Sequence, residues 1–315
     1  MSRVVVATAY GGPEVLAVVD EPTAAPGPGE ARIEVRASGV NPVDYKMYSG
    51  AFGSDPARLP LRLGLEAAGE VTAVGPDAVG PAGPVAVGDE VIAYRVAGGY
   101  ATDLVVSAQA LIPKPPDLGW AEASGLMLAG VTAWHALVAT DVSSADTVLM
   151  HGAAGGVGLM AIQLTTARGA TVIATARPAR HDLLREFGAI PVAYGAGLAD
   201  RVRAAAPHGV TAALDLVGTD EAVDVSLALV PDRGRIATIA APRRGLELGI
   251  KVLGGAPGAD PGAAIRSAAR LELATMAGQG RVRVLVARSF PLENAADAHS
   301  LSMDGHVAGK IALIA

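Results

Sequence analysis

The stretch TVLMHGAAGGVGLMAIQLTTARGATVIAT, residues 147–175, decides the fold of this chain. An apolar run leads into the glycine-rich turn HGAAGGVG, which opens a helical pattern that ends before a second apolar run. On the dinucleotide-binding template G-x-G-x-x-G, the three key positions fall on Ala153, Gly155 and Gly158. Glycine lets a pyrophosphate approach the backbone, and the helix N-terminus offers N–H groups to the phosphates. Strand, turn, helix and strand follow in the right order, which favours a dinucleotide site over a merely structural turn.

Working outward from this stretch, apolar runs continue to alternate with helical patterns. The predicted strands are 147–151, 171–175, 191–194, 212–217, 235–239 and 248–253, and the predicted helices are 159–168, 181–187 and 263–277. Such alternation predicts right-handed strand–helix–strand units and a doubly wound parallel sheet in an α/β protein.

The first hundred residues show a different sequence pattern. Short valine- and isoleucine-rich runs at 3–8, 31–37, 69–74 and 90–94 are separated by glycine and proline turns, which predicts a small β-rich domain. One helix is expected over 41–50, with Asn41 as N-cap and Asp44 completing a capping box. A proline-rich seam at 114–119 marks a domain boundary.

The residue at the end of the second strand of the dinucleotide unit selects the cofactor. NAD sites carry an acid there, about 20 residues after the glycine turn, to bind the ribose 2′-hydroxyl. Here the position holds Arg177, with Arg180 close behind. Guanidinium groups bind a 2′-phosphate well, so NADP(H) is predicted as the cofactor; the alternative is that both arginines are surface residues.

Composition excludes several other classes of protein. The 315 residues include 31 acidic and 25 basic side chains, a net charge of −6, and no lysine- or arginine-rich block suggests nucleic acid. There is no cysteine, hence no disulfide, thiolate metal site or cysteine nucleophile. No signal peptide or apolar run of membrane-spanning length is evident, so a cytoplasmic, membrane-free protein is expected.

Several motifs, in order along the chain, carry a resemblance to a known family. They are GGPEVL (11–16), PGPGE (26–30), SGVNPVDYK (38–46), GLEAAGEV (64–71), VGDEV (87–91), GGYA (98–101), AGVTAW (129–134), HGAAGGVG and GHVAGKIAL (305–313). With them the chain resembles the zinc-independent, zeta-crystallin-like quinone oxidoreductases of the medium-chain dehydrogenase/reductase superfamily.

The resemblance implies a GroES-like, β-rich catalytic domain split between 1–118 and 281–315, and an inserted Rossmann domain over 119–280. It also shows where the zinc-dependent alcohol dehydrogenases of this superfamily would differ. Asn41 stands at the position of their first cysteine ligand and Leu65 at that of their histidine. No metal site is therefore expected.

Without a metal to polarise an alcohol, the predicted reaction is hydride transfer from NADPH to a quinone or an α,β-unsaturated carbonyl. Asn41, Lys46 and Tyr48 are the catalytic candidates, because a hydrogen bond to the developing enolate or quinol oxygen would assist the transfer. Capping and packing are the plain alternatives for these residues. Two other functions remain open: a biosynthetic enoyl reductase of a specialised metabolite, and a non-catalytic NADPH-binding structural or sensor protein.

The remaining site residues follow from the glycine turn and from the family resemblance. The residues expected around the cofactor are Thr132, Ala153, Gly155, Gly156, Val157, Gly158, Thr175, Arg177, Arg180, Tyr194, Val217, Gly218, Ile239 and Ala240. Lys310 is expected to contact a phosphate or a domain interface, or to lie at the surface. A homodimer formed through the strand at 248–253 is expected by analogy.

Overall fold

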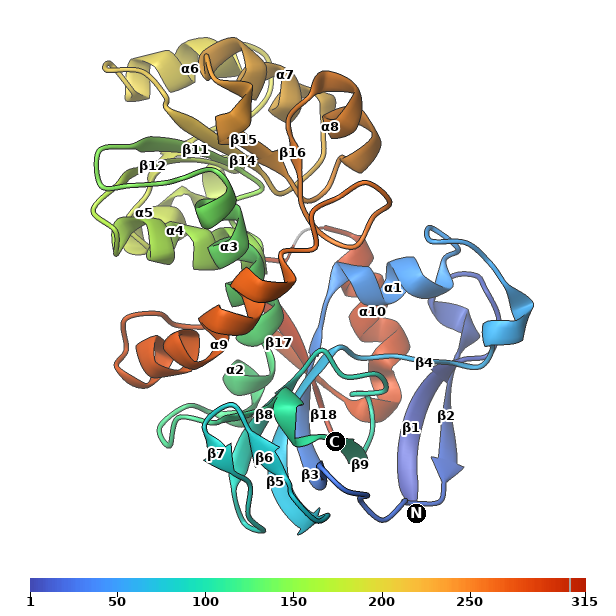
Figure 1. Ribbon diagram of the computed structural model, residues 1–315. Coiled ribbons are helices and arrows are strands. Elements are labelled where there is room, and N and C mark those ends of the chain that lie inside the picture. The colour runs from blue at the N-terminus through green and yellow to red at the C-terminus, as the bar shows by residue number, and fades with distance from the viewer. Residues whose placement is uncertain (306) are drawn as a thin grey trace. The chain divides into compact units, whose positions relative to one another are not determined.

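The computed structural model describes residues 1–305 and 307–315 (Figure 1). His306, within the motif quoted above at 305–313, lies outside the described residues. The chain forms two compact units: unit 1 comprises Met1–Leu128 and Arg270–Ala315, and unit 2 comprises Ala129–Ala269. Unit 1 is therefore built from both ends of the chain, whereas unit 2 is one continuous stretch.

Unit 2 contains a six-stranded parallel sheet in the order β13-β12-β11-β14-β15-β16. Its strands are β11 (Thr147–His151), β12 (Thr171–Thr175), β13 (Ile190–Val192), β14 (Ala212–Asp215), β15 (Ile236–Thr238) and β16 (Lys251–Val252). Numbered as they follow in the chain, the strands run 3-2-1-4-5-6, the order of the Rossmann fold. The prediction of a doubly wound parallel sheet is confirmed.

The helices between these strands pack against the sheet. They are α4 (Gly156–Thr166), α5 (His181–Glu186), α6 (Leu198–Ala205), α7 (Asp220–Leu229) and α8 (Pro242–Leu248); α3 (Met127–Ala139) precedes the first strand and α9 (Ala263–Gly278) follows the last. The central strand β11 has Val148, Leu149 and Met150 all fully buried, as expected for a strand covered on both faces. The last strand is shorter than predicted, because 242–248 is helical and Gly249 ends that helix in the left-handed conformation.

Unit 1 is mainly antiparallel sheet, organised around the long strand β3 (Glu30–Val40), which pairs with three others. The partners are β5 (Glu66–Val74), β9 (Asp103–Ser107) and β18 (Lys310–Ile314); β8 (Glu90–Tyr94), β10 (Leu111–Pro113) and β17 (Val286–Pro291) complete this sheet. A second sheet contains β2 (Leu16–Glu21), β1 (Ser2–Ala7) and β4 (Leu61–Arg62), and β6 (Val79–Gly80) pairs with β7 (Gly83–Pro84). Pairing of β18 with β3 brings the end of the chain beside residues near position 40.

Three α-helices accompany these sheets: α1 (Pro42–Tyr48), α2 (Trp120–Ser124) and α10 (Ala295–Met303). Residues 119–128 and 270–280, which the sequence analysis places in the Rossmann domain, lie in unit 1. Helix α2 packs on β3 and β5, and the Arg270 guanidinium donates to the Gln109 carbonyl at 2.7 Å. These contacts join segments distant in sequence, and they hold α2 and the Arg270 side chain within unit 1.

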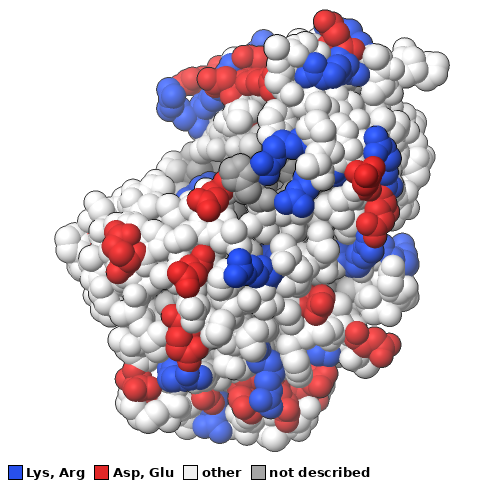
Figure 2. Space-filling model, turned by 180° about the vertical axis from the view of Figure 1, so that it is seen from behind, with Lys and Arg blue, Asp and Glu red and all other residues white. Residues whose placement is uncertain are grey.

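The surface carries both signs of charge. Figure 2 shows acidic and basic side chains interspersed over the face in view. Among the described residues, no helix is long and apolar enough to span a membrane.

Candidate functional site

The glycine-rich turn in unit 2 has the geometry of a phosphate cradle. Gly152 adopts a left-handed φ of +70°, and Gly155 caps α4 with extended backbone. The N–H groups of Gly156, Val157 and Gly158 form the first turn of α4, where no intrahelical acceptor exists. The positive end of the helix dipole therefore meets unpaired donors, an arrangement that favours an anion.

Two glycines of this turn are needed for different reasons. A Cβ on Gly158 would lie 2.4 Å from the Ala153 carbonyl oxygen, so the close contact between helix and turn requires glycine there. A Cβ on Gly155 would meet nothing closer than the Gly152 oxygen at 3.5 Å. Packing within the protein does not explain Gly155, whereas close approach of a phosphate to the backbone does.

The carboxyl ends of β14 and β15 are held by a buried carboxylate. One oxygen of Asp215 accepts the N–H groups of Val217 and Gly218 at 3.1 and 2.8 Å, and the other accepts the Thr238 hydroxyl at 2.7 Å. The Thr238 oxygen in turn accepts the Ala240 N–H at 3.1 Å. The Asp215 side chain thus fixes the backbone at Val217 and Gly218 directly and at Ala240 through Thr238. Its backbone carbonyl also accepts the Ile239 N–H at 3.1 Å. All four predicted residues lie at the edge of the sheet where Rossmann folds bind their ligand.

The two predicted arginines follow β12. Arg177 is partly exposed, and no other described residue makes a polar contact with its guanidinium. Arg180 is partly exposed as well and interacts with a neighbour. Tyr194 is half exposed after β13. Arg177 is therefore the arginine whose charge is available to a ligand.

Two predicted residues are engaged within the protein. Thr175 is buried, and its hydroxyl bonds to Nδ1 of His151 at 3.2 Å, so its side chain supports the turn from inside. Burial lowers the pKa of His151 to about 4, which keeps the imidazole neutral. Thr132 on α3 is also buried, and its hydroxyl accepts from Arg266 at 3.2 Å. These contacts shape unit 2 without using the cofactor.

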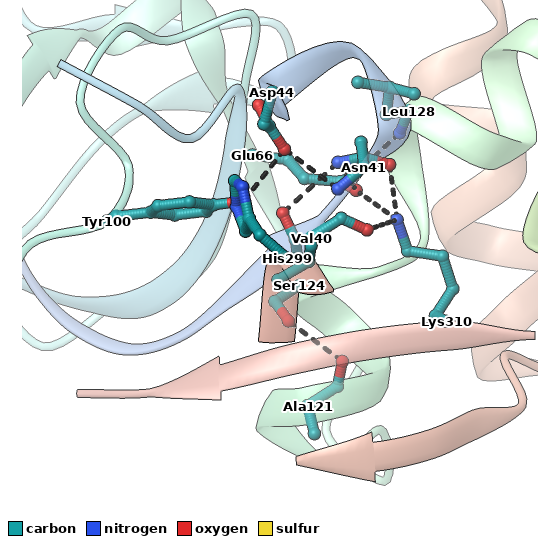
Figure 3. A network of polar contacts seen from close by, with 11 residues as sticks. Val40, Asn41, Asp44, Glu66, Tyr100, Ala121, Ser124, Leu128, His299 and Lys310 are labelled. Carbon is teal, nitrogen blue, oxygen red and sulfur yellow. Dashed lines mark hydrogen bonds and ion pairs between the residues drawn. The ribbon is translucent and has the colours of Figure 1, made fainter. Parts of the chain in front are cut away.

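In unit 1, Asn41 lies at the centre of a buried polar cluster (Figure 3). Its amide nitrogen donates to the Gly39 carbonyl at 3.2 Å and to Glu66 Oε1 at 3.0 Å, and its amide oxygen accepts from Lys310. Both amide hydrogens and the amide oxygen are used, so Asn41 has no donor left for a substrate. The predicted capping role is confirmed, since Asp44 accepts the Asn41 backbone N–H at 2.8 Å.

Lys310 is the cation of this cluster. Its ammonium is buried and donates to the Val40 carbonyl and to Glu66 Oε1, both at 3.1 Å, as well as to Asn41. The expectation of a phosphate-binding, interface or surface lysine is wrong, because three acceptors within unit 1 hold the ammonium. Glu66 Oε2 also accepts the Leu128 N–H at 2.7 Å in the first turn of α3.

This donor set does not fit a zinc ion. An amide and an ammonium group stand where a metal would need thiolate or imidazole, and the chain has no cysteine. Among the described residues, no group of three His, Asp or Glu side chains is arranged to hold a metal.

Tyr48 does not present its hydroxyl to a substrate. The side chain is fully buried, and its oxygen lies 2.8 Å from Nδ1 of His299 on α10. The sequence pattern of α1 gave no indication that Tyr48 packs inward. Burial raises the pKa of Tyr48 above the ordinary tyrosine value, which keeps the phenol protonated.

Lys46 is the catalytic candidate whose polar group remains uncommitted. It is partly buried on α1, and no described residue forms a hydrogen bond or ion pair with its ammonium. Tyr45 beside it is also partly buried, and burial raises its pKa.

Sequence reasoning missed four members of the unit 1 cluster as partners: Glu66, Tyr100, His299 and Lys310. The Tyr100 hydroxyl donates to Asp44 Oδ2 at 2.9 Å and lies 3.1 Å from Nε2 of His299. These residues stand far apart in the chain, and only the pairing of the strands brings them together. Charged residues inside apolar strand patterns, such as Glu66 and Lys310, were the available signal.

Comparison with known proteins agrees with this architecture. The alcohol dehydrogenase GroES-like domain model matches residues 27–116, and the zinc-binding dehydrogenase model matches 187–313. The quinone oxidoreductase of Pseudomonas aeruginosa is 38% identical over 193 residues, which cover 60% of this chain and 57% of that protein. The spectinabilin polyketide synthase system protein of Streptomyces orinoci is 38% identical over 228 residues, 70% of this chain but 10% of that protein.

Solved structures resemble the whole chain, among them the two that follow. A mycobacterial protein in complex with NADPH is 30% identical, with 100% of both chains covered and a TM-score of 0.85. An NAD-dependent alcohol dehydrogenase is 28% identical, with 99% of both chains covered and a TM-score of 0.86. The fold and the glycine turn define an NAD(P)-dependent oxidoreductase. The chain belongs to the medium-chain dehydrogenase/reductase superfamily, in its zinc-independent quinone oxidoreductase-like branch.

Proposed function

We propose that this protein transfers a hydride from NADPH to a quinone or to the β-carbon of an α,β-unsaturated carbonyl. The observation that carries the proposal is the buried Lys310 ammonium on Asn41 and Glu66. The family resemblance implies that Asn41 and Leu65 stand at the positions of zinc ligands in the zinc-dependent relatives. A fixed protein cation there leaves no ligand set to polarise an alcohol. Acceptors that are already activated need only alignment and a hydrogen bond.

The residues of unit 2 fit the diphosphate and adenosine parts of the cofactor. The N–H groups of Gly156, Val157 and Gly158 would hold the pyrophosphate, and Arg177 would pair with the 2′-phosphate. Backbone held by Asp215 would lie beside the nicotinamide portion. NADPH, when bound, supplies the hydride.

We propose that Lys46 donates a hydrogen bond or a proton to the acceptor oxygen. Asn41 and Tyr48 have their donors engaged inside unit 1, whereas the Lys46 ammonium has no partner among the described residues. A cationic donor stabilises negative charge as it develops on an enolate or quinol oxygen. Asn41 and Tyr48 instead keep the helix that carries Lys46 in shape.

A direct assay tests the proposal. The purified protein should bind NADPH, measured by cofactor fluorescence, and should oxidise it when 1,4-benzoquinone or a simple enone is added. Binding without turnover on either acceptor would favour the non-catalytic alternative. Absence of NADPH binding would contradict the assignment of the glycine turn.

A second candidate is an enoyl reductase acting on carrier-bound intermediates of a specialised metabolite. The alignment of 70% of the chain with a polyketide synthase protein favours it. Comparing a simple enone with the same enoyl group carried on a pantetheine thioester separates the two. A kcat/KM at least about 10-fold higher for the thioester would identify the enoyl reductase.

We also propose a homodimer formed through β16, the edge strand of the parallel sheet in unit 2. The Val252 carbonyl at this edge already accepts the Asp260 N–H at 2.8 Å, so a second copy would pair with the remaining backbone groups of the edge strand. Light scattering coupled to size exclusion would show twice the monomer mass. A proline at Val252, which removes a backbone donor, should reduce that mass to the monomer value if β16 is the contact.

A further inference from the structure

His299 on α10 is fully buried in unit 1, with a tyrosine hydroxyl at each ring nitrogen. The Tyr48 oxygen lies 2.8 Å from Nδ1, and the Tyr100 oxygen lies 3.1 Å from Nε2. The imidazole also stacks on the Tyr48 ring, with centroids 5.5 Å apart and planes 19° apart, and meets the Tyr100 ring edge-on. Burial lowers the pKa of His299 to about 4, so the ring is neutral near pH 7.

The contacts fix the direction of every hydrogen bond in this chain of groups. Asp44 Oδ2 accepts the Asn41 N–H and the Tyr100 O–H, so the Tyr100 oxygen is left to accept from Nε2 of His299. A neutral imidazole with its proton on Nε2 has an acceptor at Nδ1, which receives the Tyr48 O–H. One tautomer of His299 therefore satisfies both ring nitrogens and the hydroxyls of Tyr48 and Tyr100 at once.

Both ends of α1 depend on this histidine. Asp44 closes the capping box in the first turn of α1, and it reaches His299 through Tyr100. Tyr48 is the last residue of α1 and reaches His299 directly. Lys46 lies between these two attachment points. Figure 3 shows Asp44, Tyr100 and His299 converging beside the Asn41 cluster.

We propose that His299 is a positioning residue, which holds α1 at both ends and so keeps Lys46 in place for the acceptor. The inference rests on the proposed function, because Lys46 is the residue assigned to the acceptor oxygen. His299 itself touches neither cofactor nor acceptor in this scheme. Its effect is transmitted through Tyr48 at one end and through Tyr100 and Asp44 at the other.

Hydrogen exchange and kinetics on His299→Phe test the proposal. Phenylalanine keeps a planar ring but removes both nitrogens, so Tyr48 loses its acceptor and Tyr100 loses its donor. Amide exchange in α1 should become at least about 10-fold faster, because local opening costs less free energy. The kcat/KM for the acceptor should fall about 10- to 100-fold as the aligned group is lost, with the Kd for NADPH within about 2-fold of the wild type.

Tyr48→Phe and Tyr100→Phe provide a second test of the proposal. Each removes one hydroxyl and so breaks the connection between His299 and one end of α1. Each should show a smaller increase of exchange, at its own end of α1. These variants decide the question if His299→Phe does not fold.

Ser2→Ala is the matched control. Ser2 is buried in unit 1, its hydroxyl donates to the Asp103 carbonyl at 2.9 Å, and its side-chain hydrogen bonds among the described residues go to Thr102 and Asp103, not to α1. Exchange in α1 should stay unchanged in this variant. Unchanged α1 exchange in all three network variants, or a loss of activity no larger than in Ser2→Ala, would overturn the proposal. If the wild type turns over no acceptor, the proposed function fails, and the exchange data still decide whether His299 holds α1.

Discussion

Lys310 and Glu66 form a buried ion pair, with the ammonium nitrogen 3.1 Å from the carboxylate oxygen, although 243 residues lie between them in the chain. The pair joins the strand that ends unit 1 to a strand near its beginning. The Lys310 ammonium of this pair is the buried cation on which the proposed function rests.

Removing the cation should destabilise unit 1. We expect Lys310→Met to lower the free energy of unfolding by about 3 kcal/mol, because Glu66 would remain buried with an unpaired charge. Adding Glu66→Gln should restore more than half of this loss. Urea unfolding measures both. Arg185→Met, which breaks an exposed pair with Asp182, should cost less than about 0.5 kcal/mol, and a Lys310 effect of that size would contradict the role of the pair.

The two glycines of the turn should respond differently to alanine. Gly155→Ala should fold with nearly unchanged stability, because the protein leaves 3.5 Å of space, yet should bind NADPH at least about 10-fold more weakly. Gly158→Ala should lose stability as well, since its Cβ would lie 2.4 Å from a carbonyl oxygen. Thermal unfolding and fluorescence titration distinguish the two. Equal binding of NADPH by wild type and Gly155→Ala would argue against a phosphate at this backbone position.

Cofactor preference should depend on Arg177. Arg177→Asp should reduce the ratio of kcat/KM for NADPH over NADH by about 100-fold, because a carboxylate repels the 2′-phosphate and accepts from a 2′-hydroxyl. Steady-state kinetics with both cofactors measure the ratio. Arg203→Asp is a control, since among the described residues Arg203 pairs with exposed Asp200 on α6 alone. An unchanged preference in Arg177→Asp would rule out this residue as the phosphate ligand.

Lys46 should matter for turnover and not for cofactor binding. Lys46→Met keeps the aliphatic stem and removes the charge, so we expect kcat for the acceptor to fall about 100-fold while the NADPH Kd is unchanged. Lys46→Arg, which retains a cationic donor, should recover part of the rate. A Lys46→Met enzyme as fast as the wild type would remove Lys46 from the mechanism.

Stability should depend on pH through Asp44. Burial raises the pKa of this carboxyl to about 7, partly offset by hydrogen bonds from Asn41 and Tyr100. Between the ordinary aspartate pKa and pH 7, the folded protein keeps a proton that the unfolded chain has released, so the free energy of unfolding falls as pH rises. Asp44→Asn stays neutral, and its stability relative to the wild type should increase by about 1 kcal/mol or more from pH 5 to pH 8. If the stability difference between Asp44→Asn and the wild type did not change with pH, Asp44 would not titrate between pH 5 and pH 8.

The sequence predicted the parts of the protein that depend on local order. The turn before α4 and the cap of α1 each lie within a few residues, and the glycine and capping patterns identify them directly. The parallel sheet is built from consecutive strand–helix–strand units, each only a few tens of residues long, so its alternating pattern is also visible in the sequence. The extent of β16 was wrong because a short helix uses residues that also suit a strand. Helix α10 has no strong amphipathic signal and was not predicted.

The unit 1 cluster could not be predicted in this way. Asn41, Glu66 and Lys310 meet only because β3 pairs with both β5 and β18, and sequence spacing carries no information about that pairing. The sequence also could not show that the side chains of Asn41 and Tyr48 both point into unit 1. The resemblance to a family indicated that the cysteine and histidine ligands of zinc are absent. It did not reveal that Lys310 places a positive charge beside Asn41 and Glu66.

The split construction of unit 1 has a consequence for the order of events during synthesis. Unit 2 is complete once residue 269 has left the ribosome, whereas the long strand β3 waits for β18, some 270 residues later, to cover one side. Until then Glu66 and Asn41 are without their lysine, and an open strand edge is exposed to other chains. The Rossmann unit can therefore mature first, and unit 1 closes only when β18 arrives.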